Sequence, residues 1–121
     1  MKTCLVVDDS RVVRKVASRI LEALAFEPLE AGDGLEALAV CRAQMPDVVL
    51  LDWQMPVMDG REFLRALRAE PGGEAPVVVF CSARDEPELI AEALADGADE
   101  YIMKPFDGDI VASKFAEAGL L

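Results

Sequence analysis

Histidine is absent from this 121-residue sequence. Its absence excludes histidine metal sites and histidine acid–base catalysis, so carboxylates remain as the candidate ligands for a hard metal ion. Basic residues are also scarce: 12 lysines and arginines face 23 acidic residues, which gives a net charge of −11. A surface this acidic repels polyanions, so neither nucleic acid nor an anionic membrane is expected as a direct partner.

Long apolar stretches are missing too. No run approaches the roughly 20 residues that a membrane-spanning helix needs, and the N-terminus enters a strand-like segment without the pattern of a signal peptide. We therefore expect a cytoplasmic protein. The three cysteines, Cys4, Cys41 and Cys81, are odd in number and far apart. They are predicted to be small buried hydrophobic residues, with no redox or zinc role.

Strand-like and helical patterns alternate along the whole chain, with no linker or repeat. At 53% hydrophobic residues, the length suits one domain over residues 1–121. The expected strands are Thr3–Val7, Glu27–Ala31, Val48–Leu51, Val77–Cys81 and Glu100–Met103. The expected helices are Val12–Leu24, Leu35–Ala43, Arg61–Ala69, Glu86–Asp96 and Asp107–Ala118. This (βα)5 alternation predicts an α/β fold, a doubly wound parallel sheet with helices on both faces.

Local signals sharpen this assignment. Ser10 is a candidate cap for the first helix, Pro28 limits its strand to a sheet edge, and Gly97 is a natural left-handed helix end. Two helices carry apolar residues at helical spacing and are expected to bury them. In the first helix these are Val12, Val13, Val16, Ala17, Ile20, Leu21 and Leu24, and in the fourth they are Leu89, Ile90, Ala93 and Leu94.

Chemically active side chains follow four of the five expected strands. Asp8 and Asp9 follow the first strand, Asp52 the third, Ser82 the fourth and Lys104 the fifth. Ligands of an open parallel sheet bind outside the carboxyl ends of its strands. The sequence therefore predicts three carboxylates, a hydroxyl and an ammonium at one edge of the sheet.

Three adjacent carboxylates repel one another, so a positive charge is expected among them. Mg²⁺ fits, because it prefers oxygen ligands and is held by one or two carboxylates together with phosphate oxygens. A carboxylate oxygen of Asp52 could then attack a phosphoryl group while the metal and Lys104 neutralise charge on its equatorial oxygens. Ser82 would donate a hydrogen bond to the attached group.

Taken together, these segments resemble the receiver domain of two-component response regulators, in its stand-alone CheY-like form, across the whole chain. The matching segments are Leu5–Ser10, Leu50–Gly60, Ser82-Ala83 and Lys104-Pro105-Phe106. Each is weak alone, but all four in this order are specific. The resemblance implies a flavodoxin-like fold with the five-stranded sheet order 2-1-3-4-5.

The resemblance also implies roles for individual residues. Asp52 would be the phosphoacceptor, and Asp8, Asp9, Asp52 and the backbone carbonyl of Gln54 would hold Mg²⁺ or Mn²⁺. The partner would be a sensor histidine kinase or a histidine phosphotransfer protein, which donates from a phosphohistidine.

Further implied roles concern switching and hydrolysis. Ser82 and Tyr101 match a hydroxyl and an aromatic residue that couple during activation, and the Lys104–Pro105 bond matches a cis peptide. Gln54 and Arg84 match positions that flank the phosphoryl group and tune its hydrolysis. Whether Arg84 would shield the acyl phosphate or bind an anion stays open.

The expected function is a switch, not an enzyme beyond self-catalysed phosphoryl acceptance and slow autodephosphorylation. The chain ends just after the fifth helix, so a stand-alone monomer is expected whose output is a changed contact with a target protein. The candidate docking surface is the fourth helix, fifth strand and fifth helix, which carries Tyr101. The most familiar such role is chemotaxis signalling to a flagellar motor switch. A phosphorelay intermediate or a phosphate sink in cell-cycle or stress signalling would have the same sequence features.

Two functions of other classes are disfavoured. A metal-dependent phosphatase with an aspartyl nucleophile needs a second carboxylate two residues after Asp52, where Gln54 stands. A nucleotide-binding module needs a glycine-rich loop after the first strand, where Asp8 and Asp9 stand instead. The remaining acidic residues considered are expected to be solvated or helix-capping: Asp85, Asp96, Asp99, Asp107 and Asp109.

Overall fold

A computed structural model describes residues 1–84 and 86–121 of the chain. Five parallel strands form one sheet in the order β2-β1-β3-β4-β5. The predicted (βα)5 fold and its strand order are therefore confirmed, and β2, which contains Pro28, lies at the predicted edge.

Every element lies within one residue of its predicted bounds. The strands are β1 Thr3–Val7, β2 Glu27–Ala31, β3 Val48–Asp52, β4 Val77–Ser82 and β5 Glu100–Met103. The helices are α1 Arg11–Ala23, α2 Gly34–Ala43, α3 Gly60–Ala69, α4 Pro87–Ala95 and α5 Gly108–Glu117.

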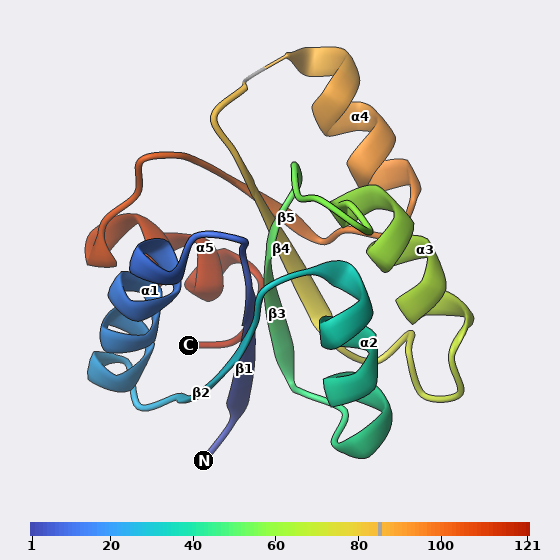
Figure 1. Cartoon of the computed structure of the whole chain (residues 1–121). Helices are drawn as coiled ribbons and strands as arrows, with labels where there is room; N and C mark the ends of the chain where they lie inside the picture. The colour runs from blue at the N-terminus through green and yellow to red at the C-terminus, as the bar shows by residue number, and fades with distance from the viewer. Residues whose placement is uncertain (85) are drawn as a thin grey trace.

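The helices form two layers around the sheet. Figure 1 shows α1 and α5 on one face and α2, α3 and α4 on the other. Alternate residues of each strand therefore contribute to two separate cores. One core joins Val6 and Leu50 to α1 and α5, through Leu21 and Phe115. The other is built from the remaining strand side chains and the three opposite helices, and it includes Leu64 of α3.

Two of the predicted apolar helix faces are wrong in part. Val12 and Val16 of α1 are 73% and 50% exposed, and Leu94 of α4 is 45% exposed. In α1 the sheet covers only the narrower face that carries Ala17 and Leu21, both buried. The helix thus has an apolar face against the sheet and further apolar side chains at its surface.

The ends of the helices follow the predicted capping signals. The hydroxyl of Ser10 accepts a hydrogen bond from the N–H of Val13 at the start of α1, and Gly97 has a φ of +112° after α4. Asp107 caps α5 as expected. Three helices begin with the same pair, an aspartate cap followed by glycine: α2, α3 and α5.

Two aspartates predicted to be solvated or capping also have specific partners. Asp96 pairs with Arg61 and Arg65 of α3, at 2.8 and 3.3 Å. Asp99 accepts from the N–H of Val78 at 2.8 Å, which joins the loop before β5 to the start of β4. Asp109 is exposed, and Asp85 lies outside the described residues.

The cysteines are buried and free, as predicted. Desolvation by burial raises the pKa of the Cys41 thiol to about 11, and burial raises the pKa of Cys4 and Cys81 further. All three are therefore unreactive thiols at neutral pH. Among the described residues, no helix is long and apolar enough to cross a membrane.

The three Asp–Gly helix starts yield a stability prediction. A Cβ on Gly60 would lie 2.6 Å from the carbonyl oxygen of Asp52, and one on Gly34 would lie 2.7 Å from that of Met58. A Cβ on Gly108 would meet only Ile20, at 3.9 Å. Gly60→Ala and Gly34→Ala should each lower the free energy of unfolding by about 1–3 kcal/mol.

Gly108→Ala is the matched control in the same sequence context. It should be neutral or stabilise by up to about 1 kcal/mol, because alanine loses less backbone entropy. Urea unfolding of the three variants measures these differences. Equal destabilisation by all three would contradict the steric argument.

Candidate functional site

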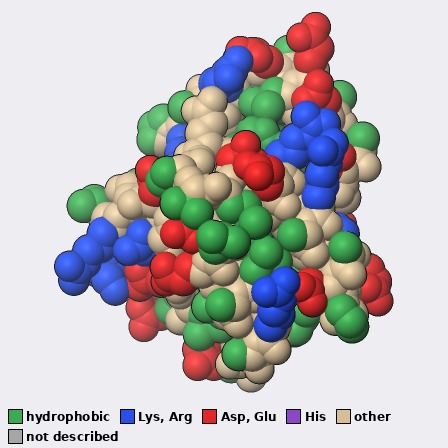
Figure 2. Space-filling model, turned by 45° about the vertical axis from the view of Figure 1, so that its right-hand side comes forward, with side chains coloured by type: hydrophobic (Ala, Val, Ile, Leu, Met, Phe, Trp, Pro, Cys, Tyr) green, Lys and Arg blue, Asp and Glu red, His purple; other side chains and the backbone are tan. Residues whose placement is uncertain are grey.

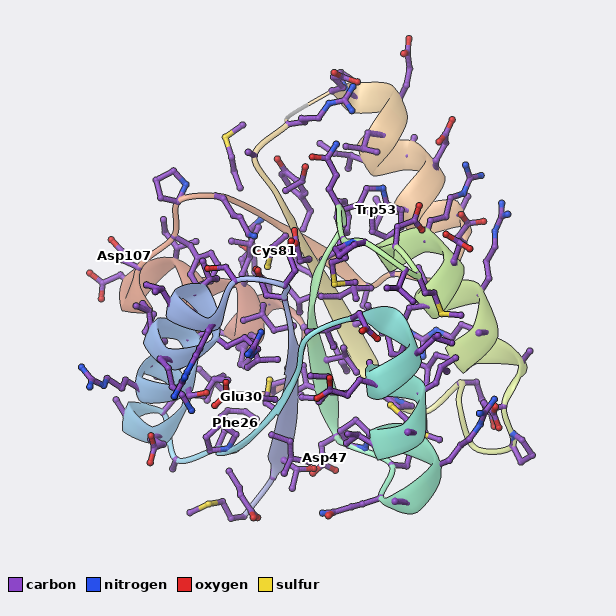
Figure 3. The ribbon with its side chains drawn as sticks, viewed as in Figure 1. Phe26, Glu30, Asp47, Trp53, Cys81 and Asp107 are labelled. Atoms are coloured by element: carbon purple, nitrogen blue, oxygen red, sulfur yellow. The ribbon has the colours of Figure 1, made fainter. Side chains whose placement is uncertain are left out.

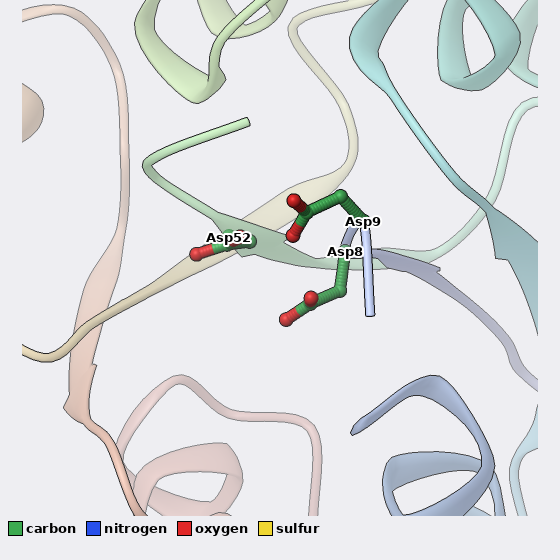
Figure 4. A group of neighbouring side chains, drawn as sticks. All are labelled: Asp8, Asp9 and Asp52. Atoms are coloured by element: carbon green, nitrogen blue, oxygen red, sulfur yellow. The ribbon is translucent and has the colours of Figure 1, made fainter. Parts of the chain in front are cut away.

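Three carboxylates meet at the carboxyl edge of the sheet. Asp8 directly follows β1, Asp52 is the last residue of β3, and both are buried, at 3% and 7% exposure. Asp9 is exposed. One carboxylate oxygen from each lies within 4.8 Å of the others, and Figure 4 shows their side chains around one space. The predicted clustering of these residues is therefore present in the fold.

Lys104 joins two of the three carboxylates. Its Nζ lies 2.7 Å from Oδ2 of Asp8 and 3.1 Å from Oδ1 of Asp52. The lysine is about one-fifth exposed, whereas the carboxylates are almost entirely buried. The ammonium provides the only positive charge in contact with either carboxylate among the described side chains.

The pKa values reflect this crowding. Burial, followed by the negative charge of Asp8, raises the pKa of the Asp52 carboxyl, while Lys104 and a backbone hydrogen bond from Gln54 oppose the rise. Burial disfavours the charged form of Lys104, but its hydrogen bond to Asp8 and the charge of Asp52 raise its pKa overall. The ammonium thus stays charged at neutral pH, and its carboxylate partners remain incompletely compensated.

Asp8 is held at each of its polar groups. Its N–H donates to the carbonyl of Ala31 at 3.1 Å, its Oδ1 accepts from the N–H of Ser10 at 2.9 Å, and its carbonyl accepts from Nη1 of Arg14 at 2.7 Å. Arg14 was not identified from the sequence. The available signal was a cation six residues after Asp8, on the first turn of a helix that starts at the site.

The predicted switch residues lie beside this cluster. The Ser82 hydroxyl accepts from the N–H of Arg84 at 3.0 Å, and the Tyr101 hydroxyl donates to the carbonyl of Arg84 at 3.0 Å. Both therefore contact the same backbone segment after β4. A row of aromatic rings, Trp53, Phe80 and Tyr101, connects that segment with the residue next to Asp52, with centroid separations of 5.1 and 4.9 Å.

The two flanking residues are less engaged with the carboxylates. The guanidinium of Arg84 pairs with Glu86 at 2.6 Å, and Gln54 is exposed. Both line an open hollow of about 450 Å³ between the loop after β3 and α4. The Lys104–Pro105 peptide is cis, the isomer that the resemblance implies.

The loop after β3 is closed at its neck and tight at its tip. The N–H of Gly60 donates to the carbonyl of Trp53 at 3.1 Å, and that of Met58 to the carbonyl of Pro56 at 2.8 Å. Val57, between Pro56 and Met58, has a φ of +69° and is 72% exposed. A β-branched residue in this γ-turn is strained, as backbone near functional sites often is.

An apolar groove borders the cluster on the other side. It has a volume of about 330 Å³ and is lined by residues of α1, of the segment after β4 and of the segment after β5. They are Val12, Val13, Val16, Ala83, Lys104, Pro105 and Phe106. Val12 and Val16 of α1, which were predicted to be buried, are thus part of a surface next to Lys104.

The donor set fits a small, hard divalent cation. All three clustered side chains offer carboxylate oxygens, the ligands that Mg²⁺ and Mn²⁺ prefer, and no sulfur or nitrogen ligand is among them. The exposed side of the cluster, at Asp9, leaves room for the water molecules that Mg²⁺ retains. Figure 3 shows the neighbouring Trp53, which could report on binding.

The raised pKa of Asp52 leads to a pH prediction. The pKa of Asp52 is higher in the folded state than in the unfolded state. The folded state therefore loses stability as the pH rises from the unfolded-state pKa through the folded-state pKa. In EDTA at pH 7, Asp52→Asn should therefore melt at a higher temperature than wild type. The gap should close as the pH falls below about 3.9, the ordinary pKa of aspartate. Thermal melts between pH 3 and 8 measure it, and a lower melting temperature for the variant at pH 7 would contradict it.

Comparison with known proteins gives a consistent result. The response regulator receiver domain family matches residues 4–115. The chain is 39% identical over 102 residues to the DNA-binding response regulator MtrA of Mycolicibacterium paratuberculosis and 38% identical to the phosphate regulon transcriptional regulatory protein PhoB of Escherichia coli. These matches cover 84% of this chain but 44% of either relative.

Solved structures extend the similarity to the whole chain. The chemotaxis response regulator CheY4 of Vibrio cholerae is 32% identical, with a TM-score of 0.91, and the match covers 100% of this chain and 99% of CheY4. A CheY-like receiver domain protein from Methanospirillum hungatei has a TM-score of 0.86 at 29% identity, over 98% and 93% of the two chains. Proteins of this kind are switches and not enzymes, apart from slow autodephosphorylation. From its fold and its sequence, the chain belongs to the response regulator receiver domain family.

Proposed function

We propose that this protein is a phosphorylation switch in which Asp52 accepts a phosphoryl group from a histidine kinase or a histidine phosphotransfer protein. The observation that carries this proposal is the contact of Lys104 with both Asp8 and Asp52. A single lysine that joins two buried strand-end carboxylates leaves negative charge in excess, and that excess suits a divalent cation and a phosphoryl group.

The chemistry follows from the positions of these groups. An oxygen of Asp52 forms a bond to phosphorus while the P–N bond to the donor imidazole breaks; the electron pair stays on that nitrogen, and the ring, which carries a proton on its other nitrogen, leaves as neutral imidazole. Asp8, Asp9, Asp52 and the carbonyl of Gln54 would hold Mg²⁺ or Mn²⁺, which supplies charge neutralisation on the phosphoryl oxygens. Lys104 already lies 3.1 Å from Asp52, and it would exchange its contact with the Asp52 carboxylate for a contact with a phosphoryl oxygen.

The segment after β4 would transmit the change. Ser82 ends β4, next to β3, and its hydroxyl can donate to a phosphoryl oxygen while still accepting from Arg84. Tyr101 holds the carbonyl of Arg84, so a shift of this backbone changes the environment of the tyrosine. The surface of α4, β5 and α5 would then contact a target differently in the two states.

The apolar groove beside Lys104 is the surface proposed for the phosphodonor. Its exposed valines lie on α1, which also carries Arg11, Arg14, Lys15 and Arg19, four of the twelve cations in an otherwise acidic chain. The partner surface would therefore be an apolar helix face with acidic side chains around it. Figure 2 shows one face of the molecule, on which charges of both signs surround hydrophobic areas.

A CheY-like receiver switch is the form of the proposal that CheY4 supports, because that match covers 100% of this chain and 99% of CheY4. A flagellar motor switch is accordingly the proposed target. MtrA and PhoB are more than twice as long as their matched part, and MtrA is a DNA-binding response regulator. An intermediate in a phosphorelay or a phosphate sink remains the alternative.

Phosphoryl acceptance can be tested with a small donor. Acetyl phosphate and Mg²⁺ should add one phosphoryl mass to wild type and none to Asp52→Asn, because the other carboxylate beside Lys104, that of Asp8, has both oxygens engaged, by Ser10 and by Lys104. EDTA should also prevent the addition in wild type. Intact-mass spectrometry measures all three samples. A phosphoryl mass on Asp52→Asn would reject the acceptor assignment.

The docking proposal separates a protein donor from a small one. The donor in this test is any phosphohistidine protein that labels wild type. Val16→Asp should slow phosphotransfer from it by about tenfold, because a charge enters an apolar interface. Labelling by acetyl phosphate should not change. Leu94→Asp on α4 is the matched control, with similar exposure, and should transfer normally. Equal rates for the two variants would exclude the groove as the donor surface.

A further inference from the structure

The peptide between Asp8 and Asp9 is held by an arginine whose ion pair is not part of the carboxylate cluster. Nε of Arg14 lies 3.1 Å from Oε1 of Glu30, and Nη1 of the same guanidinium donates to the carbonyl of Asp8 at 2.7 Å. Both side chains are largely buried, at 18% and 26% exposure. One guanidinium thus connects α1, β2 and the first residue after β1.

Glu30 is placed for this contact by the register of the sheet. It pairs with Val6, two residues before Asp8, and its neighbour Leu29 packs into the core on the opposite face. The side chain of Glu30 therefore points toward α1, where Figure 3 shows it. Lys15 binds its other oxygen, Oε2, at 2.8 Å, which leaves Oε1 for Arg14.

The carbonyl that Arg14 binds belongs to the peptide between Asp8 and Asp9. Asp8 also has side-chain partners, Ser10 and Lys104, that fix its carboxylate. Within residues 1–84 and 86–121, the Asp9 carboxylate makes neither a hydrogen bond nor an ion pair. Its position relative to Asp8 and Asp52 therefore depends on the backbone, and the contact from Arg14 fixes the orientation of the peptide immediately before it.

We propose that Arg14, aligned by Glu30, is a positioning residue for the divalent cation: it holds the Asp8–Asp9 peptide so that the Asp9 carboxylate faces Asp8 and Asp52. This inference rests on the proposed metal-dependent function and adds to it a residue outside the ligand set. The fork of the guanidinium is essential, because one nitrogen binds Glu30 while another binds the carbonyl. Lysine has a single nitrogen on a flexible stem and cannot hold both partners in this geometry.

Charge and positioning predict opposite results for this residue. Arg14 is a cation near a cation site, so removing its charge alone would strengthen Mg²⁺ binding. Loss of a group that orients a metal ligand weakens binding instead, typically by tenfold or more. Arg14→Gln removes both the charge and the fork, whereas Arg14→Lys removes the fork and keeps the charge.

Mg²⁺ titration followed by the fluorescence of Trp53 provides the readout, and it requires no phosphorylation. The dissociation constant should rise about tenfold in Arg14→Gln and several-fold in Arg14→Lys. Lys15→Gln is the control: it removes a cation from the same carboxylate of Glu30 without touching Asp8, and it should bind Mg²⁺ as wild type or slightly more tightly. Thermal melts in EDTA verify that each variant is folded.

Arg14→Lys keeps the experiment decisive if Arg14→Gln fails to fold. Wild-type affinity in Arg14→Lys, or tighter binding in Arg14→Gln, would overturn the positioning role while leaving the phosphoacceptor proposal intact. Absence of any Mg²⁺ response in wild type would instead reject both, so failure of the two proposals can be distinguished.

Discussion

The contact of one ammonium with two buried carboxylates is the interaction on which the site depends. Lys104 follows β5, and its partners Asp8 and Asp52 follow or end β1 and β3, so three strands must be in register before the group exists. Burial makes this arrangement costly, because each charge loses water. The cost leaves Asp52 with a raised pKa and a site that gains from any additional positive charge.

The rest of the fold supports this edge of the sheet. Glycines at the starts of α2 and α3 allow the helices to approach the loop after β3 without a steric clash. The Asp8 backbone is tied to β2 through Ala31 and to α1 through Arg14. In the proposed switch, a change of ligand at the carboxylates acts on the backbone of Arg84, which both the Ser82 and the Tyr101 hydroxyl contact.

Two features of the surface distinguish the sides of the site. Toward α1, apolar side chains border Lys104, and the helix itself carries four cations, which suits a protein partner of opposite charge. Toward α4, the hollow is polar, and Arg84 is paired with Glu86. Donor and target can therefore contact different faces of one small domain, as the proposed switch requires.

The order of strands and helices, their bounds to within one residue, and the meeting of Asp8, Asp52 and Lys104 were predictable from the sequence. Alternating periodicity and the geometry of parallel sheets suffice for those features. Tertiary structure alone decided that Val12 and Val16 lie in a surface groove, because helical spacing does not tell which apolar positions the sheet covers. It also decided that Arg14 contacts Asp8, since that contact depends on Glu30 from β2, sixteen residues away along the chain.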